Sequence, residues 1–185
     1  MLNENGSLRE KNAAWLEKHR ADSAGHTILI AEDSESDVFF LLHAFSRSKV
    51  KNPIYVVRTG REAMDYLSGV GDFADRTSFP FPGVVFLDLL MPHPDGFEIL
   101  KWKSKQSNLP RTLWIAMSNF DTARAINEAY SAGATTFLSK PLDAIDVQNL
   151  ISAFEHFWLL QHTQRLKNDS TMSRADLSLS EARQR

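Results

Sequence analysis

Short apolar runs and amphipathic segments alternate five times along this chain, and the alternation restricts its possible folds more than any other feature. The apolar runs have strand length and favour strands by composition: Thr27–Ala31, Ile54–Arg58, Val84–Leu87, Leu113–Met117 and Thr135–Leu138. Segments of helical period follow them: Asp37–Ser46, Gly60–Ser68, Gly96–Ser104, Asp121–Ala132 and Asp143–Leu160. Strands that are apolar on both faces indicate a parallel sheet covered on both sides. We therefore expect an α/β, doubly wound (βα)5 fold.

The two ends of the chain differ in composition from the middle. Residues 1–25 are polar and carry one helical signal, Ser7 followed by Glu10, so we expect an N-terminal helical extension. Residues 26–160 hold nearly all the apolar periodicity and form the predicted domain, and residues 161–185 are expected to be a polar tail. The long connection at 69–83 contains three Gly and two Pro, which predicts a surface loop.

Composition excludes several classes of function. The 185 residues include 21 Lys and Arg against 23 Asp and Glu, so no overall basic field attracts nucleic acid or an anionic membrane. Cysteine is absent, which excludes disulfides, thiolate zinc sites and a cysteine nucleophile. The charged N-terminus lacks the apolar segment of a signal peptide, and no apolar run approaches the roughly 18 residues of a membrane span. We therefore expect a cytoplasmic protein without a nucleic acid or membrane partner.

Polar and charged side chains follow four of the predicted strands. Glu32 and Asp33 follow the first strand, Asp88 the third, Ser118 the fourth and Lys140 the fifth. The carboxyl ends of parallel strands meet at one edge of an open sheet, where ligands bind, so these side chains should lie together. Carboxylates within about 4–6 Å repel one another unless a cation neutralises them, and oxygen ligands without His or Cys suit Mg²⁺. Taken singly, Asp33 could equally cap the following helix.

Four segments at these strand ends resemble the receiver domain of two-component response regulators. ILIAEDSESD is similar to the acidic-pair segment of that family, VVFLDLLMPHPDGFEIL to its phospho-acceptor segment, WIAMS to its hydroxyl segment and FLSKP to its lysine segment. Asp33 and Asp88 are 55 residues apart, Ser118 follows 30 residues later and Lys140 another 22. The resemblance covers about residues 26–160 and implies a flavodoxin-like (CheY-like) sheet with strand order 2-1-3-4-5.

The resemblance implies a chemical role for each residue at these strand ends. Asp88 would be the nucleophile that takes a phosphoryl group from the phosphohistidine of a sensor histidine kinase. Asp33 and Asp88, with the backbone carbonyl of Leu90, would bind Mg²⁺ directly, and Glu32 would hold a metal-bound water. Lys140 would form an ion pair with the phosphoryl oxygens.

The resemblance also implies a conformational switch. Ser118 would donate a hydrogen bond to a phosphoryl oxygen and draw its loop inward, and Phe137, three residues before Lys140, would swing into the space left behind. Phe lacks a hydroxyl, so burial alone would drive this movement. The alternative is that Phe137 is an ordinary core residue of its strand.

Two apolar residues predict a long-lived phosphorylated state. In the family the side chains two positions after the acceptor and two after the hydroxyl overhang the path of the hydrolytic water; here they are Leu90 and Phe120. Neither can orient a water, so we expect slow self-dephosphorylation. Asn119 is larger than the Ala or Gly usual beside the hydroxyl, which would crowd the phosphoryl oxygens and slow the forward transfer as well.

Three functions are compatible with these residues. The first is a single-domain receiver, not an enzyme acting on other molecules, which catalyses its own phosphotransfer and signals through contacts with a downstream protein. The second is a metal-dependent phosphatase with an aspartyl nucleophile, but such enzymes need an Asp two residues after the nucleophile, where this chain has Leu90. The third is a pseudo-receiver that never takes phosphate. The long 69–83 loop and the EDSESD segment look like those of regulators paired with phytochrome-type or hybrid sensor kinases.

Surplus apolar residues on two helices predict covered surfaces. The helix expected at Asp143–Leu160 directs a core stripe inward (Val147, Leu150, Ile151, Phe154 and Trp158), which leaves Ile145, Phe157, Leu159 and Leu160 partly off the stripe. These four residues predict a homodimer interface or a docking face on the last two helices. The alternative is that they pack against the tail or against Leu8–Leu16. On the first helix of the domain we expect Val38, Phe40, Leu41 and Phe45 in the core, and the N-terminal helix over Phe39 and Leu42.

Overall fold

The computed structural model describes residues 26–107 and 109–158 and confirms the predicted alternation of strands and helices. The strands are β1 (Ile28–Ala31), β2 (Ile54–Val57), β3 (Val84–Asp88), β4 (Leu113–Ser118) and β5 (Thr136–Ser139). The α-helices are α2 (Glu35–Arg47), α3 (Gly60–Ser68), α4 (Gly96–Ser104), α5 (Ala123–Ala132) and α6 (Ala144–Ala153), and two 3-10 helices are η1 (Gly71–Phe73) and η2 (Glu155–Phe157). The predicted helix within residues 1–25, Leu159, Leu160 and the tail at 161–185 lie outside the described residues.

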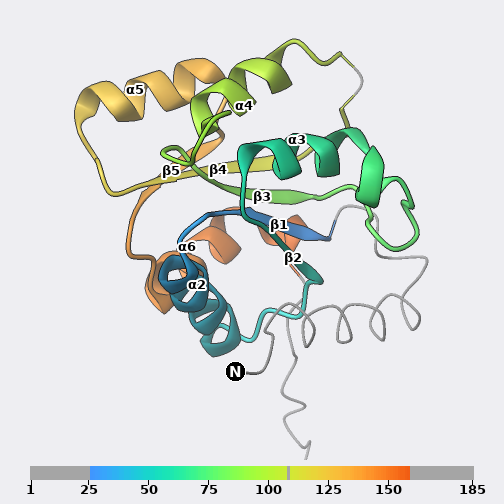
Figure 1. Cartoon of the computed structure of the whole chain (residues 1–185). Coiled ribbons are helices and arrows are strands. Elements are labelled where there is room, and N and C mark those ends of the chain that lie inside the picture. The colour runs from blue at the N-terminus through green and yellow to red at the C-terminus, as the bar shows by residue number, and fades with distance from the viewer. Residues whose placement is uncertain (1–25, 108, 159–185) are drawn as a thin grey trace, which may run out of the picture.

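The sheet is parallel with strand order β2-β1-β3-β4-β5, as the resemblance implied. Helices α3, α4 and α5 cover one face of the sheet, and α2 and α6 cover the other (Figure 1). The chain leaves β1 toward β2 on one side and later returns to place β3 on the other. Beyond the carboxyl ends of β1 and β3 the strand order reverses, and a ligand site is expected there.

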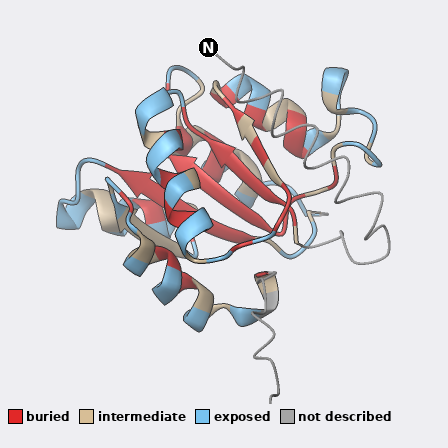
Figure 2. Cartoon of the chain, turned by 90° about the horizontal axis from the view of Figure 1, so that it is seen from below, coloured by how far each residue is buried: buried red, intermediate tan, exposed pale blue. Residues whose placement is uncertain are grey.

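Two apolar layers, one on each side of the sheet, stabilise the fold. Leu29 and Ala31 of β1 pack toward α3 and α4, whereas Ile28 and Ile30 pack toward α2 and α6, because successive side chains of a strand point to opposite faces. The central strands β1, β3 and β4 are buried throughout, the edge strands β2 and β5 are partly exposed, and the helices bury mainly the side that faces the sheet (Figure 2). In the described part of the chain the longest helix has 13 residues, and none combines the length and apolar character that a membrane crossing requires.

The last helix is shorter than the sequence predicted. It ends at Ala153, and the chain continues through Phe154, which leaves the helical conformation (φ −136°, ψ 50°), into η2. Trp158 is buried with its ring 6.2 Å from that of Phe45, and the Asn52 side-chain amide donates a hydrogen bond to the Phe157 carbonyl at 2.8 Å. The prediction of a helix to Leu160 was wrong because burial of Trp158 and this hydrogen bond to Asn52 compensate the helical turns that are lost.

In α2 the structure decides one alternative that the sequence left open and corrects one expectation. Ser34, not Asp33, caps α2, and its hydroxyl accepts a hydrogen bond from the Asp37 backbone N–H at 3.3 Å. Asp33 therefore keeps its carboxylate for the site at the strand ends. Phe40 was expected in the core but is 51% exposed, because the buried stripe of α2 is Val38, Leu41, Ala44 and Phe45. Phe39 is exposed as well, and its ring stacks on His43.

Side-chain hydrogen bonds in both directions hold the loop at 69–83 against β2 and α3. The Tyr55 hydroxyl donates to the Ser78 carbonyl at 2.6 Å, and the Tyr66 hydroxyl donates to the Pro80 carbonyl at 3.0 Å. The Arg76 guanidinium donates to the carbonyl groups of Tyr66 and Leu67 at the end of α3, at 2.8 and 2.9 Å. The loop therefore packs as a part of the domain against the β2–α3 side.

Candidate functional site

The strand order brings the predicted site residues to one edge of the sheet. Glu32 and Asp33 follow β1, and they lie beside Asp88, the last residue of β3, because β1 and β3 are hydrogen-bonded neighbours. Ser118 ends β4, and Lys140 follows β5 with its backbone N–H donating to the Ser118 carbonyl at 2.9 Å. Residues separated by up to 108 positions in the sequence thus face one another.

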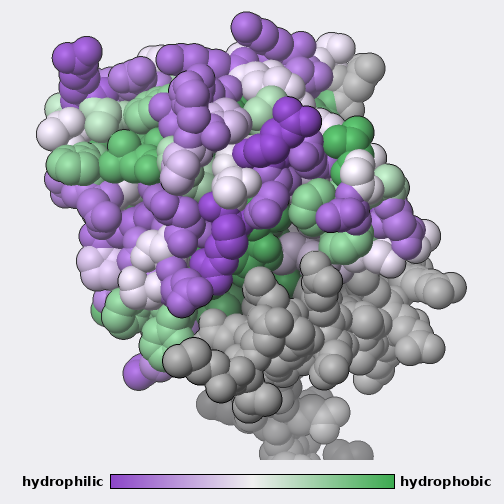
Figure 3. Space-filling view, in the orientation of Figure 1, coloured by the Kyte–Doolittle hydropathy of each residue, from purple (hydrophilic) through white to green (hydrophobic). Residues whose placement is uncertain are grey.

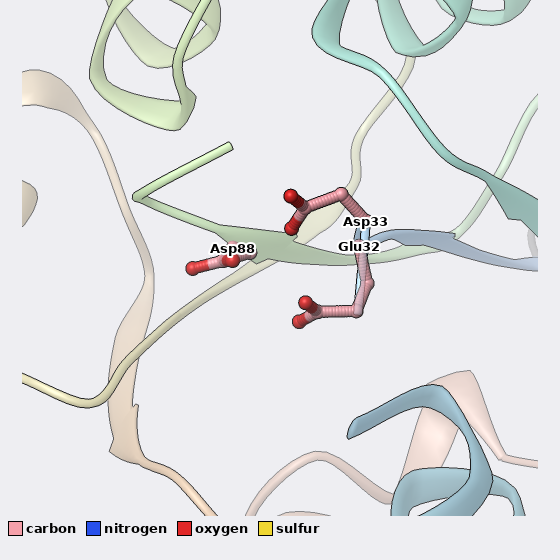
Figure 4. A group of neighbouring side chains, drawn as sticks. All are labelled: Glu32, Asp33 and Asp88. Atoms are coloured by element: carbon pink, nitrogen blue, oxygen red, sulfur yellow. The ribbon is translucent and has the colours of Figure 1, made fainter. Parts of the chain in front are cut away.

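Three carboxylates form the centre of this site. One carboxylate oxygen from each of Glu32, Asp33 and Asp88 lies within 4.8 Å of the other two. Figure 4 shows Asp33 and Glu32 reaching from the end of β1 to opposite sides of the Asp88 side chain. Glu32 and Asp88 are buried, whereas Asp33 is exposed, so a solute approaches from the Asp33 side.

The backbone around Asp88 fixes the direction of its carboxylate. The Leu90 N–H donates to Asp88 Oδ1 at 3.0 Å, which leaves Oδ2 to face the other side chains of the site. Gly96, at the start of α4, packs directly on this segment, since a Cβ there would overlap the Asp88 carbonyl oxygen and lie 2.7 Å from Leu89 Cα. Asp95 caps α4 by accepting from the Glu98 N–H at 2.8 Å. The Asp95-Gly96 pair therefore allows α4 to begin against the acceptor strand.

Lys140 contacts three carboxylates at once. Its Nζ lies 2.5 Å from Glu32 Oε2, 3.0 Å from Asp88 Oδ2 and 3.0 Å from Asp37 Oδ2, and its side chain is only 4% exposed. Burial by itself lowers the pKa of Lys140, but the contacts with Glu32 and Asp88 outweigh burial and raise the pKa above its ordinary value. The ammonium group is therefore charged at neutral pH and offsets part of the negative charge.

Glu32 is the carboxylate whose protonation the site changes most clearly. Burial and, less strongly, the nearby charge of Asp88 together raise the pKa of Glu32 to about 7, against the lowering effects of Lys140 and of the Ser34 N–H. A second cation at the site would stabilise the ionised form. The geometry adds a contact that was not expected for Glu32, since one of its oxygens pairs directly with Lys140.

Ser118 and Phe137 occupy the positions that the resemblance implied. Ser118 is buried, and its hydroxyl oxygen accepts a hydrogen bond from the Phe120 N–H at 3.0 Å. A hydroxyl that accepts in this way can still donate its own hydrogen to an incoming oxygen. Phe137 is half-buried against the core layer that contains α5, and Ser139, two residues later, donates to Asp121 at 3.0 Å. That hydrogen bond connects the loops that carry Phe120 and Lys140.

The apolar residues expected around the site are exposed. Leu90 is 51% exposed and Phe120 is 63% exposed, and each lies two residues beyond a side chain of the site, Asp88 and Ser118 respectively. Asn119 is exposed as well. Exposed apolar side chains at the mouth of a charged site can exclude water or contact a partner.

One residue of the site, Asp37, was not predicted from the sequence. It belongs to the first turn of α2 and pairs with Lys140, which is 103 positions away in the sequence. The sequence did contain an indication of this position. Asp37 lies five residues after Glu32, in the first turn of a helix that begins close to the end of β1. Its identity as a contact of Lys140 nevertheless required the tertiary structure.

The donor set of this site fits a divalent metal ion. The three carboxylates offer oxygen atoms close enough to share one cation, and hard cations such as Mg²⁺, Mn²⁺ and Ca²⁺ prefer oxygen ligands. Lys140 neutralises only part of a group of four acidic side chains. The remaining repulsion favours metal binding on the exposed, Asp33 side.

Comparisons with known proteins agree with this geometry. Residues 28–152 match the family model of the response regulator receiver domain. Response regulator Rcp1 of Synechocystis is 25% identical over 132 residues, which cover 71% of this chain and 88% of Rcp1. The crystal structure of its Mn²⁺-bound form matches with a TM-score of 0.60 over 75% of this chain and 97% of that one.

Two further solved structures are similar to the described domain. Response regulator RPA3017, in red light signalling of R. palustris, is 34% identical with a TM-score of 0.63, over 72% of this chain and 93% of its own. The phosphorylated cyanobacterial phytochrome response regulator RcpA is 26% identical with a TM-score of 0.60, over 74% of this chain and 99% of its own. The similarity therefore extends over nearly the whole length of each of these proteins.

Proposed function

Because this chain belongs to the response regulator receiver domain family of two-component signalling, we propose that Asp88 is the residue on which it accepts a phosphoryl group. The observation that supports this assignment is the surroundings of Asp88. Its carboxylate is buried at a strand end, with two further carboxylates within 4.8 Å and the Lys140 ammonium 3.0 Å from Oδ2. Such a site combines a nucleophile with the means to stabilise phosphoryl charge.

The transfer forms one bond and breaks one. An oxygen of the Asp88 carboxylate attacks the phosphorus of a phosphohistidine as the P–N bond breaks, and the electron pair of that bond stays on the imidazole nitrogen, which takes a proton from solvent. Lys140 lies where its ammonium can turn to the phosphoryl oxygens, and the Ser118 hydroxyl can donate to another of them. The products are an aspartyl phosphate and a free histidine.

We propose Mg²⁺ as the metal of this site. Asp33, Asp88 and the Leu90 carbonyl would bind it, with Glu32 holding its water in addition to contacting Lys140. When bound, the metal neutralises phosphoryl charge during transfer. The chain itself keeps the nucleophile fixed, through the Leu90 N–H and the close packing of Gly96.

The output of the proposed regulator is a change in its protein contacts. Movement of Ser118 toward the phosphoryl group would shift the β4–α5 loop, and the half-buried Phe137 would follow it inward. The surface formed by α5 and β5 would change, and a downstream protein would read that change. No step in this sequence needs a DNA-binding surface.

The partner that supplies the phosphoryl group is a sensor histidine kinase, and we propose one of the phytochrome type. The support is similarity to RPA3017 and RcpA, which belong to red light and phytochrome signalling.

We also propose a homodimer through the last two helices, where Ile145 of α6 is 64% exposed. On the face seen in Figure 3, apolar side chains are interspersed among hydrophilic ones rather than forming one continuous patch. Sedimentation with and without a phosphoryl mimic tests the dimer, which a monomer under both conditions would exclude.

Phosphate incorporation from acetyl phosphate tests the proposed acceptor. The wild-type protein with Mg²⁺ should take up one phosphoryl group that is stable to neutral pH gel electrophoresis and labile to hydroxylamine, and Asp88→Asn should take up none. Undiminished incorporation in Asp88→Asn would assign the acceptor elsewhere. Incorporation in neither protein would identify a pseudo-receiver, and sustained turnover of a phosphomonoester would identify a phosphatase.

A further inference from the structure

The three carboxylates that contact Lys140 differ in how well they tolerate its loss. An ammonium group has three N–H donors, and in this site each faces a different carboxylate: Glu32, Asp37 and Asp88. The Glu32 side chain is 1% exposed and that of Asp88 is 7% exposed, whereas that of Asp37 is 26% exposed. Water can therefore replace the ammonium at Asp37 but not at Glu32.

A phosphoryl group on Asp88 must compete for an ammonium that is already fully engaged. Leaving the buried Glu32 without a cation would strand an unpaired charge, which is costly in a protein interior. Releasing Asp37 costs little because solvent can hydrate its carboxylate. The ion pair to Asp37 is therefore the one that the site can give up as Lys140 turns to the phosphoryl oxygens.

We propose that Asp37 is a positioning residue that holds the Lys140 ammonium while Asp88 is unphosphorylated and releases it to the phosphoryl group, so that Asp37 limits how readily the site is phosphorylated. The inference rests on the proposed function of Asp88 and Lys140. It adds a competitor for Lys140 from the first turn of α2, outside the acceptor strand and the metal-binding group.

Direct repulsion acts in the same direction as competition. The carboxylate oxygens of Asp37 and Asp88 each lie 3.0 Å from the same nitrogen, so they are at most 6.0 Å apart. Phosphorylation replaces one negative charge on Asp88 by about two. Asp37 is 26% exposed and solvent screens it in part, so with an effective dielectric constant of about 40–80 one additional charge across that distance corresponds to about three- to tenfold in an equilibrium constant.

The decisive comparison is Asp37→Asn against Glu35→Gln. Glu35 lies in the same first turn of α2, is exposed and is not among the carboxylates that contact Lys140, so its neutralisation controls for net charge and for the helix dipole. The assay measures the ratio of phosphorylated to unphosphorylated protein at limiting acetyl phosphate and saturating Mg²⁺. This ratio should be about three- to tenfold higher in Asp37→Asn than in either Glu35→Gln or wild type. A ratio equal to that of Glu35→Gln, or lower than that of wild type, would overturn the proposal.

A second measurement needs neither metal nor phosphate. In ¹H–¹⁵N spectra of the metal-free protein, the Lys140 ammonium should exchange its protons slowly in wild type and in Glu35→Gln, and several-fold faster in Asp37→Asn. Unchanged exchange in Asp37→Asn would show that Asp37 does not hold the ammonium. These results are separable from the proposed function, which fails only if wild-type protein takes up no phosphate on Asp88. Asp37→Ser, a second variant that lacks the charge, should behave like Asp37→Asn in both measurements.

Discussion

Replacing Asp88 by Asn should make the metal-free protein more stable, although the substitution removes an ion pair with Lys140. In the folded protein the Asp88 carboxylate attracts one cation, 3.0 Å away, and repels the carboxylates of Glu32 and Asp33, each with an oxygen within 4.8 Å. Asn keeps the size of Asp, and its side-chain carbonyl can still accept the hydrogen bond from the Leu90 N–H. The sign of the effect therefore depends on the balance of charges.

The distances indicate that repulsion is the larger contribution. With an effective dielectric constant of about 20, attraction over 3.0 Å amounts to about 5.5 kcal/mol. Above about pH 8, where Glu32 with its pKa of about 7 is ionised, two repulsions over 4.8 Å or less amount to at least about 7 kcal/mol together. The difference favours Asp88→Asn by about 1 kcal/mol, and removal of a buried charge adds to it. For a chain of this size, such a change raises the melting temperature by about 2–4 °C.

Thermal unfolding above about pH 8, in EDTA and in Mg²⁺, provides the assay, because Glu32 with a pKa of about 7 is then ionised. In EDTA the Asp88→Asn variant should melt above wild type. Mg²⁺ should stabilise wild type by about 3 kcal/mol at a concentration one hundred times the dissociation constant, and the variant much less, because it has lost a carboxylate ligand. The difference between the two melting temperatures should then become smaller or change sign. Asp72→Asn, an exposed Asp in η1, is the matched control and should change stability by less than about 0.5 kcal/mol.

A melting temperature for Asp88→Asn below that of wild type in EDTA would refute the reasoning. That result would mean that the contact with Lys140 outweighs both repulsions. Equal stabilisation of both proteins by Mg²⁺ would show that the metal binds elsewhere. Either outcome can be read without phosphorylation, so it bears on the electrostatics of the site alone.

Three further predictions follow from other parts of the structure. Leu90→Asn and Phe120→Glu should each speed the decay of the aspartyl phosphate about tenfold, because a group that orients one water is worth about 1.4 kcal/mol in the barrier; unchanged decay in both would show that these positions do not limit hydrolysis. Trp158→Ala should cost about 3–5 kcal/mol in urea unfolding, since the ring is buried against Phe45, and a loss under 1 kcal/mol would place Trp158 outside the core. Burial raises the pKa of Tyr55 from 10 to about 12, so the folded protein holds this proton more tightly than the unfolded chain does. The free energy of unfolding should therefore fall by at most about 2–3 kcal/mol as the pH rises from 10 to 12, and Tyr55→Phe should show a smaller fall over that range.

The sequence alone determined most of the secondary structure and five of the side chains at the central site. Strands and helices are local features, set by the period of apolar residues and by capping side chains, and each element predicted within the described residues is present. The strand ends identified Glu32, Asp33, Asp88, Ser118 and Lys140 because all parallel strands end at the same edge. The strand order came from resemblance to a family, since periodicity cannot specify which strands are neighbours. The limits proposed for the domain at residues 26 and 160 remain predictions.

Local sequence patterns gave wrong predictions where contacts with a distant part of the chain decide the conformation or the burial of a residue. Apolar residues continue at helical spacing beyond Ala153, yet α6 ends there because Trp158 is buried beside Phe45 on another helix. Phe40 lies within an apolar run that exceeds one face of α2, and only packing against the sheet decides which members of the run are buried. Periodicity indicates how many faces are apolar but not which neighbour covers them.

Only the tertiary structure decided how the charges of the site are paired. Lys140 was predicted to pair with phosphoryl oxygens, and the structure adds that its ammonium contacts three carboxylates, from the end of β1, from α2 and from β3. Asp37 joined the site because the first turn of α2 meets the loop after β5, although 103 positions separate it from Lys140. Electrostatic interactions depend on distance and on exposure to solvent, and both are established only when separate elements pack together.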